Sequence, residues 1–276
     1  MFARGIEYKT AEQVRLMRQA GLVVAEVLAA VREHARPGVT TAELDTVAAA
    51  VIGAAGAVPS FLGYHGYPAT ICVSVNEEVV HGIPGDRRLR DGDVVSVDAG
   101  AIVKGWHGDS AVTFILGDAD PADAALVEAT RRAMWAGVAA LSTGRRVGDV
   151  GRTVEESITA SAAADGTPYG IVEDYTGHGI GSAMHQMPDV VNFDARDRGP
   201  RLRRGMCLAV EPMVTRGTSE VTELDDGWTA VTADGSRAAH WEHTVAITPG
   251  GVWVLTAEDG GEDELRARGV TVTPVE

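Results

Sequence analysis

The sequence predicts a mixed α/β fold, of the α+β kind, in which two similar halves share one sheet. In each half, apolar residues first recur at three- and four-residue steps, which is typical of amphipathic helices, and segments rich in β-branched residues follow. This order occurs over residues 11–119 and again over residues 120–256. No linker rich in Pro, Ser or charge separates the halves, so we expect a single domain over residues 1–276, with a charged, peripheral tail at 257–276.

The first half begins with two predicted helices. Apolar residues repeat at helical spacing over residues 14–31, and a Pro-Gly pair follows. Thr40 and Glu43 have the spacing of a capping box, so a second helix should begin there. Two segments rich in β-branched residues, 70–75 and 93–115, are predicted to be strands, and the longer one should fold as a hairpin.

The second half repeats this order. Asp120 and Pro121 are typical of an N-cap and a first helical residue, and Gly144 should end the helix that follows. A further helix is predicted over residues 150–162. The predicted strand segments are 170–174, 206–214 and 240–247.

The composition excludes several classes of function. The 276 residues include 39 acidic and 24 basic side chains, a formal net charge of −15, and no polybasic patch of Lys and Arg. Such a surface repels phosphate backbones and anionic lipids, so we expect neither nucleic acid nor membrane as the primary partner. Two cysteines cannot form a disulfide framework, and the first ten residues lack the apolar core of a signal peptide, so we expect a cytoplasmic protein.

Acidic residues occur inside apolar, strand-like segments of both halves. If the hairpin turn is centred between residues 103 and 104, Asp98 and Asp109 lie directly opposite each other on one face. Buried like charges in this position destabilise a sheet, and a bound cation reverses the interaction; the alternative is a solvated sheet edge. Glu211 and Glu242 occupy two similar segments of the second half. Four inward-facing carboxylates favour a metal site, because without a metal they would be hard to keep ionised.

The neighbours of the histidines distinguish some of them. His178 lies in the segment Gly-His-Gly-Ile-Gly, whose glycines permit tight turns and close approach to a ligand. His107 is two residues before Asp109 and could share its face, whereas strand alternation should turn His243 away from the preceding carboxylate. His240 carries no signal of its own.

Six short motifs occur in the order and spacing of a known enzyme family. They are Asn76-Glu77-Glu78-Val79-Val80-His81-Gly82-Ile83-Pro84, Asp98 with His107-Gly108-Asp109, Gly177-His178-Gly179-Ile180-Gly181, Val210-Glu211-Pro212-Met213, Asp226-Gly227-Trp228-Thr229 and Trp241-Glu242-His243-Thr244. With these motifs the chain resembles a type I methionine aminopeptidase over residues 8–256. The resemblance implies the pita-bread fold, a pseudo-twofold curved antiparallel sheet backed by helices. It also implies a cytoplasmic monomer that removes the initiator methionine from nascent polypeptides, at the ribosome, when the second residue is small.

The resemblance further implies a centre of two divalent metal ions, Co, Mn, Fe or Zn, that activate a water for hydrolysis. Five residues would hold the ions: Asp98, Asp109, His178, Glu211 and Glu242. Asp109 and Glu242 would bridge the two ions. Glu211 would also move a proton to the departing amine, His185 would donate to the scissile carbonyl oxygen, and His81 would position the peptide.

A pocket for the methionine side chain is implied as well, lined by Tyr64, Tyr67, Cys72 and Trp228. Two positions depart from the family pattern. Met184 stands where many members have a bulky aromatic residue, and Gln186 stands where they have an acidic one. Met184 either forms a wall of this pocket or simply packs in the core.

Two other classes of protein fit part of the pattern. An Xaa-Pro aminopeptidase or prolidase would have the same five ligands, but such enzymes usually carry a large amino-terminal domain, whereas the first predicted helix here begins about ten residues into the chain. A non-catalytic binding protein of this fold would have lost ligands, whereas all five ligand positions and both additional histidines, His81 and His185, are present. A methionine aminopeptidase is the reading that uses every motif.

Overall fold

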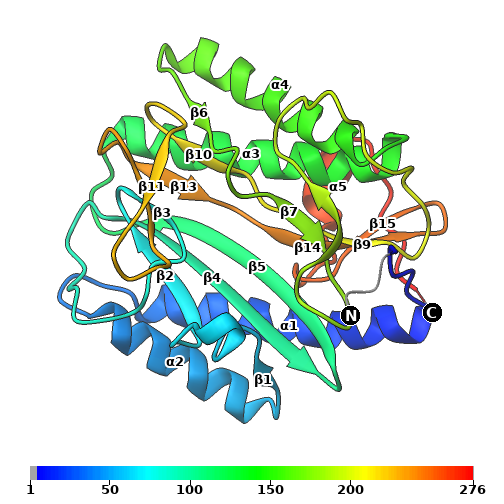
Figure 1. The fold of residues 1–276 in the computed structure, drawn as a ribbon, viewed down its shortest axis with the longest axis horizontal. Coiled ribbons are helices and arrows are strands. Elements are labelled where there is room, and N and C mark those ends of the chain that lie inside the picture. Colours follow the sequence, from blue (N-terminus) through cyan, green and yellow to red (C-terminus); the bar gives the residue numbers. More distant parts are fainter. Residues whose placement is uncertain (1–4, 276) are drawn as a thin grey trace.

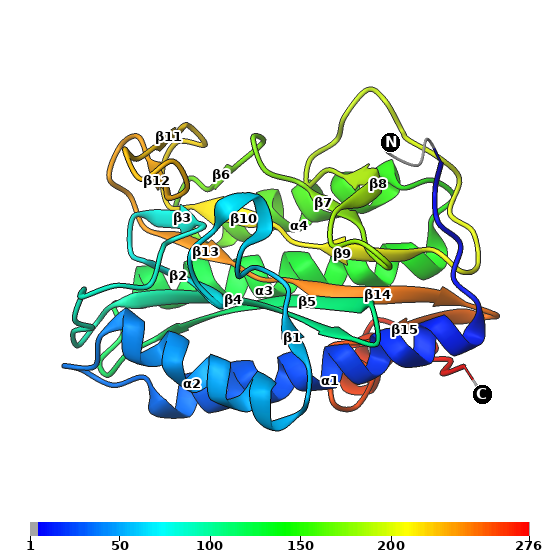
Figure 2. The same cartoon turned by 60° about the horizontal axis from the view of Figure 1, so that its bottom comes forward.

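The computed structural model describes residues 5–275, with helices on two outer sides of a central set of strands (Figures 1 and 2). The helices are α1 (Ala11–His34), α2 (Thr41–Ala54), α3 (Pro121–Thr143), α4 (Gly148–Asp165) and α5 (Glu262–Ala267). The strands are β1 (Val58–Pro59), β2 (Ile71–Val75), β3 (Glu78–Val80), β4 (Val94–Val103), β5 (Trp106–Ile115), β6 (Gly170–Ile171), β7 (Gly177–Gly179), β8 (Gln186–Val190), β9 (Cys207–Val210), β10 (Met213–Thr215), β11 (Val221–Glu223), β12 (Ala230–Thr232), β13 (Ala238–His240), β14 (His243–Thr248) and β15 (Gly251–Val254). In Figure 1, the blue helices α1 and α2 lie along one side of β4 and β5, and the green helices α3 and α4 lie on the opposite side.

The first half forms as its capping residues predict. Thr40 Oγ1 accepts a hydrogen bond from the Glu43 amide (3.2 Å), and the Glu43 carboxylate accepts one from the Thr40 amide (2.7 Å). This reciprocal pair is the expected capping box, and α2 begins directly after it. The apolar faces of α1 and α2 pack against β2, β4 and β5 in one core, with Val27 and Leu44 fully buried.

The second half confirms its predicted helix boundaries. Asp120 Oδ1 accepts a hydrogen bond from the Ala122 amide (2.8 Å) at the start of α3, and Gly144 caps its end. The predicted helix over residues 150–162 lies within α4. Both helices pack against β9, β14 and β15 in a second core.

The carboxyl-terminal tail is packed into the molecule, so the expectation that it is peripheral is wrong. α5 buries Leu265 completely in the core of the second half, and Glu264 forms an ion pair with Arg131 of α3 (2.5 Å). Val272 forms a bridge with Val252 of β15. A few apolar side chains among charged ones therefore suffice to dock this segment.

The hairpin of β4 and β5 has a different register from the predicted one. Asp98 pairs with Ala111, and Asp109 pairs with Gly100, so the two aspartates are not directly opposite. The turn is centred one residue later, on Lys104 and Gly105. Both residues have positive φ angles, 50° and 83°, as a two-residue type I′ hairpin turn requires. A shift of two residues in the pairing keeps both aspartates on one face.

Strands of the two halves meet at Ala111 of β5. Ala111 and Glu242 exchange both backbone hydrogen bonds, with N···O distances of 3.4 and 2.9 Å. Nearby, Thr113 Oγ1 donates to the His240 carbonyl (2.7 Å) and accepts from the His240 amide (2.9 Å). Because Ala111 also pairs with Asp98 on its other side, one continuous row of residues crosses from the first half into the second.

The row extends one strand further. β9 pairs with β14, where Val210 lies opposite His243, and β10 pairs with β13, where Met213 lies opposite His240. The register is the same in both pairs, so the intervening residues Glu211 and Glu242 also lie opposite each other. Asp98, Ala111, Glu242 and Glu211 therefore form a single row across the sheet, and three of the four carry carboxylates.

Both cysteines are free and buried, as expected for thiols outside a disulfide framework. Among residues 5–275, no helix is both long and apolar enough to span a membrane. The expected lack of a signal segment involves residues 1–4, which lie outside the described part of the chain.

Candidate metal centre and substrate pocket

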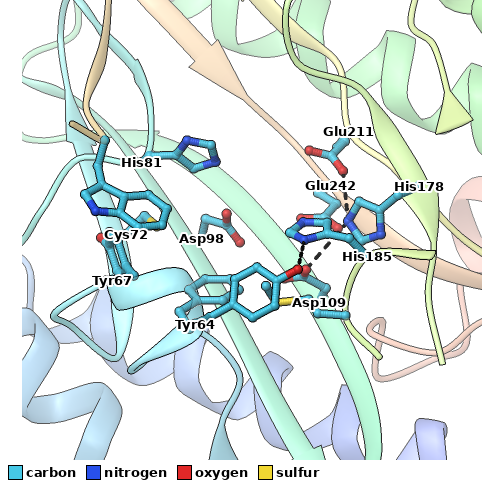
Figure 3. A pocket seen from close by; sticks show the side chains of 13 residues that line it. Tyr64, Tyr67, Cys72, His81, Asp98, Asp109, His178, His185, Glu211 and Glu242 are labelled. Atoms are coloured by element: carbon cyan, nitrogen blue, oxygen red, sulfur yellow. Dashed lines mark hydrogen bonds and ion pairs between the residues drawn. The ribbon is translucent and has the colours of Figure 1, made fainter. Parts of the chain in front are cut away.

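The structure brings all twelve predicted site residues to one cavity of about 110 Å³, together with Phe61. In Figure 3, Asp98 lies between two groups of side chains. Tyr67, Cys72 and His81 are on one side of it, and His178, His185, Glu211 and Glu242 are on the other. Phe61 gave no signal in the sequence, because a single aromatic residue in a loop is compatible with any packing role.

Four buried carboxylate oxygens in this cavity have no hydrogen-bond partner within the described chain. They are Asp98 Oδ1, Asp109 Oδ1, Glu211 Oε1 and Glu242 Oε1. Leaving buried polar atoms unpaired is costly, and each such atom calls for a missing partner. Four carboxylates with one imidazole are hard, oxygen-rich donors of the kind that bind divalent cations. Atoms of Asp109, His178 and Glu242 already lie within 4.8 Å of one another, so the residues present fit a metal centre.

Burial disfavours the ionised form of all four carboxyl groups in this cavity. Burial raises the pKa of Asp109 to about 7, and it raises the pKa values of Asp98, Glu211 and Glu242 well above their usual range. Repulsion from the neighbouring carboxylates adds to the effect of burial at Asp98, Glu211 and Glu242. A cation would replace this repulsion by attraction.

His178 faces the carboxylates with one of its two ring nitrogens. Its Nδ1 lies 3.0 Å from the carbonyl oxygen of Gly179, which fixes the tautomer with the proton on Nδ1. The free Nε2 then faces Glu211 Oε1 at 3.3 Å and Asp109 Oδ2 at 3.9 Å. Burial lowers the pKa of His178 to about 3, so the ring is neutral and its Nε2 lone pair is available to a metal.

His185 lies beside this cluster on a turn that precedes β8. Its ring centroid is 4.3 Å from that of His178, and its Nδ1 is 2.8 Å from the hydroxyl of Tyr64 (Figure 3). Burial lowers the pKa of His185 below its usual value, which keeps the ring neutral near pH 7. A neutral imidazole held by one hydrogen bond can still donate or accept through its second nitrogen.

The opposite side of the cavity is uncharged. The rings of Tyr67 and Trp228 meet edge to face at 5.0 Å, and the Tyr67 hydroxyl donates to the backbone carbonyls of Ile71 and Gly82. Met184 is buried with Cys72 and Phe61 in the same apolar cluster and also lines the cavity, so it does both things that the sequence left open. Aromatic rings and sulfur atoms make a soft, polarisable wall.

His81 faces the metal-site residues from the pocket side. Its ring is 6.3 Å from that of Trp228, and its backbone has a positive φ of 60°. Burial lowers its pKa to about 4, so this ring is neutral as well. Non-glycine residues in this conformation are uncommon and recur at functional sites.

His240 is a further buried residue near the site, and it was not predicted as a site residue. Its Nε2 is 3.8 Å from Glu211 Oε2 and has no hydrogen-bond partner within residues 5–275. The signal was available, because His240 precedes Glu242 by two residues and strand alternation places both on one face. Two further histidines have structural partners: His107 Nδ1 lies 3.0 Å from Ser60 Oγ, and His243, which faces away from the site as expected, has its Nδ1 2.8 Å from Thr256 Oγ1.

Comparisons with known proteins identify the family of this chain. The sequence model of metallopeptidase family M24 matches residues 15–249. The methionine aminopeptidase 1 of Mycobacterium tuberculosis is 51% identical over 254 residues, which cover 92% of this chain and 96% of the relative.

Solved structures agree in the fold. The crystal structure of the methionine aminopeptidase of Thermotoga maritima matches with a TM-score of 0.88 and 41% identity, covering 92% of this chain and all of that one. The prolidase of Pyrococcus furiosus matches with a TM-score of 0.71 and 20% identity, and the match covers 91% of this chain but 65% of the prolidase. The second likeness concerns the fold alone, and together they confirm the expected pita-bread architecture. By its sequence and its structure, this chain belongs to metallopeptidase family M24 and, within that family, to the methionine aminopeptidases.

Proposed function

We propose that this protein removes the first methionine from polypeptides whose second residue is small. One observation carries the proposal: four unpaired buried carboxylate oxygens lie next to an uncharged pocket walled by aromatic rings and sulfur. The carboxylates supply a place for cations, and the pocket suits an unbranched thioether side chain. Substrates would be the amino termini of nascent chains in the cytoplasm, reached at the ribosome by a monomeric enzyme.

We infer that two divalent ions, among Mn, Fe, Co and Zn, would be held by five residues. These would be Asp98 and Asp109 from the first half and His178, Glu211 and Glu242 from the second. The approach of Asp109 Oδ2 to within 3.9 Å of His178 Nε2, from different halves of the chain, supports a shared centre. When bound, such ions lower the pKa of a water and offset the charge that develops on the scissile carbonyl oxygen.

The other residues would bind, orient and move protons. Glu211, buried beside the neutral ring of His178, would carry a proton to the departing amine. His185, held at its Nδ1 by Tyr64, would donate to the carbonyl oxygen as negative charge develops there. His81 would position the peptide between the metal centre and the pocket. The pocket for the methionine side chain would comprise Tyr64, Tyr67, Cys72, Met184 and Trp228.

We further propose that residues 1–276 act as one catalytic domain made of the two halves. The support is the origin of the ligands, because Asp98 and Asp109 come from the first half and the other three from the second. Neither half alone carries the complete donor set. The backbone pairing of Ala111 with Glu242 fixes the two sets relative to each other.

Hydrolysis of short peptides tests the function. With Mn or Co added, we expect cleavage of Met-Ala-Ser, much slower cleavage of Met-Leu-Ser, and little cleavage of Ala-Pro-Ala. Prolonged dialysis against a chelator should abolish cleavage, and added metal should restore it. Cleavage of only the proline peptide would instead assign the Xaa-Pro specificity of the prolidase class, and full activity in metal-free protein would contradict the proposed centre.

A further inference from the structure

The segment that precedes α1 holds the turn that carries His185. The carboxylate of Glu7 accepts hydrogen bonds from the amide and the hydroxyl of Ser182 (3.1 and 2.6 Å) and from Gln186 Nε2 (3.0 Å). Lys9 Nζ donates to Gln186 Oε1 and to the Glu7 carbonyl, both at 3.1 Å. We call these four residues, Glu7, Lys9, Ser182 and Gln186, the clamp. Figure 2 shows the blue segment before α1 close to β8, which begins at Gln186.

The clamp grips the turn on both sides of His185. Ser182 precedes His185 by three residues, and Gln186 follows it directly. A Cβ atom at Gly181 would collide with the side chains of Glu7 and Lys9, so the clamp lies directly against the backbone of the turn. Because the Lys9 amide also donates to the Gly205 carbonyl (2.7 Å), the clamp is itself fixed to the chain that leads into β9.

Lys9 is an unusual residue to find in this position. It is one of two lysines in the sequence, and its side chain is only 2% exposed. Lysine is almost never fully buried unless it is paired, because removing an ammonium group from water is costly. An apolar side chain of similar length would fill the same volume without that cost, so packing alone does not explain a lysine here. The ammonium group does what an apolar group cannot: it fixes the amide orientation of Gln186.

We propose that Glu7 and Lys9 are positioning residues that set the imidazole of His185 against the scissile carbonyl oxygen. This inference rests on the proposed role of His185 as a donor in the reaction. A donor aimed at a developing charge is effective only within narrow limits of distance and angle, and a displacement of about 1 Å can cost about 100-fold in rate. His185 has Tyr64 as its side-chain hydrogen-bond partner, so the backbone of its turn must supply the remaining constraint. The clamp supplies it from a segment more than 170 residues away in sequence.

A double-mutant cycle tests the clamp. Lys9→Met should lower kcat about tenfold, with KM and metal content little changed, and His185→Ala should lower kcat by about 10²–10³-fold. In the double variant the Lys9→Met effect should disappear, because there is no imidazole left to position. Lys104→Met is the matched control, since Lys104 is the other lysine and lies exposed in the β4–β5 turn. It should leave kcat unchanged.

A second readout does not depend on activity. Amide hydrogen exchange over residues 181–186 should be faster in Lys9→Met and in Glu7→Gln than in the unaltered protein, and unchanged in Lys104→Met. Ser182→Ala removes one hydroxyl donor and provides a milder variant if Lys9→Met does not fold. Multiplicative losses in the double variant, or full kcat in Lys9→Met, would overturn the positioning role while leaving the function intact. Full kcat in His185→Ala would overturn the proposed role of His185 itself, and the clamp proposal with it.

Discussion

Ala111 lies between Asp98 and Glu242 in one row of the sheet, pairing with each of them on opposite sides. Directly paired residues of neighbouring strands point to the same face, so the methyl group of Ala111 lies between two carboxylates. It is fully buried. A small side chain at this point leaves room between the acidic groups that a larger one would fill.

Ala111→Leu should therefore reduce the number of bound metal ions per chain by at least one. The added volume would occupy the space between the carboxylates, and overpacking in a buried site costs about 1–3 kcal/mol when the surroundings cannot relax. Elemental analysis after gel filtration measures the metal content. Val112→Leu, on the opposite face of the same strand, is the control and should keep full occupancy. An Ala111→Leu protein with unchanged metal content would show that the ions do not lie over this row.

Asp109→Asn should stabilise the metal-free protein above pH 7. Burial raises the pKa of Asp109 to about 7 in the folded state, whereas the value in an unfolded chain is about 3.9. Between these values the folded protein binds a proton that the unfolded chain does not, so this carboxyl group makes the folded state progressively less stable as the pH rises from about 4 to 7. The Asn side chain does not titrate, so the variant avoids this loss of stability. Its free energy of unfolding should exceed that of the unaltered protein by about 2–4 kcal/mol above pH 7 and should be nearly equal to it at pH 4.

Chemical denaturation of both proteins in a chelator, at several pH values, measures the difference. Added Mn should reverse the order of stability, because the unaltered protein would bind an ion that the variant holds less well and would be stabilised by that binding. A variant that is less stable than the unaltered protein at pH 8 without metal would contradict the burial of an ionised carboxylate here.

The sequence predicted the helices and the acidic residues of the site better than it predicted how they meet. Capping residues such as Thr40 and Asp120 act locally, within one turn, so their effect is readable from neighbouring residues. The register of the β4–β5 hairpin depended instead on whether Val103 or Gly105 joins Lys104 in the turn. That choice is made by backbone conformation, and the positive φ angles at Lys104 and Gly105 decide it.

Contacts between distant polar residues left no pattern in the sequence. Glu7 and Gln186 are 179 residues apart, and a single hydrogen bond between them produces neither periodicity nor a motif. The departure of Gln186 from the acidic residue of related enzymes acquires a reason only in the structure, where its amide both donates to Glu7 and accepts from Lys9. A carboxylate at position 186 could not donate to the carboxylate of Glu7, and the two negative charges would repel each other.

Gly179→Ala should destabilise the protein and weaken metal binding together. β7 carries His178 between two glycines, and a Cβ at position 179 would collide with the Met187 carbonyl group. The strands must separate to admit it, which should cost about 1–3 kcal/mol and displace His178 from Glu211. Thermal unfolding and a Mn titration measure the two effects. Gly53→Ala is the control: apart from its chain neighbours and the adjacent backbone of its own helix, no atom of the described structure lies within 4 Å of the added methyl, and this helical site should gain about 0.5–1 kcal/mol.

Tyr64→Phe should lower kcat by less than His185→Ala does, and neither variant should lose metal. The Tyr64 hydroxyl holds Nδ1 of His185 at 2.8 Å, so its removal frees the ring to rotate but leaves the imidazole in place. Removal of the imidazole itself would eliminate the proposed donor to the carbonyl oxygen, and loss of a donor that acts mainly in the transition state typically costs about 10²–10³-fold in rate. Steady-state kinetics on Met-Ala-Ser, paired with elemental analysis, separates the two effects. Loss of metal from His185→Ala would make this residue a ligand, and an equal loss of kcat in both variants would move the essential donor to Tyr64.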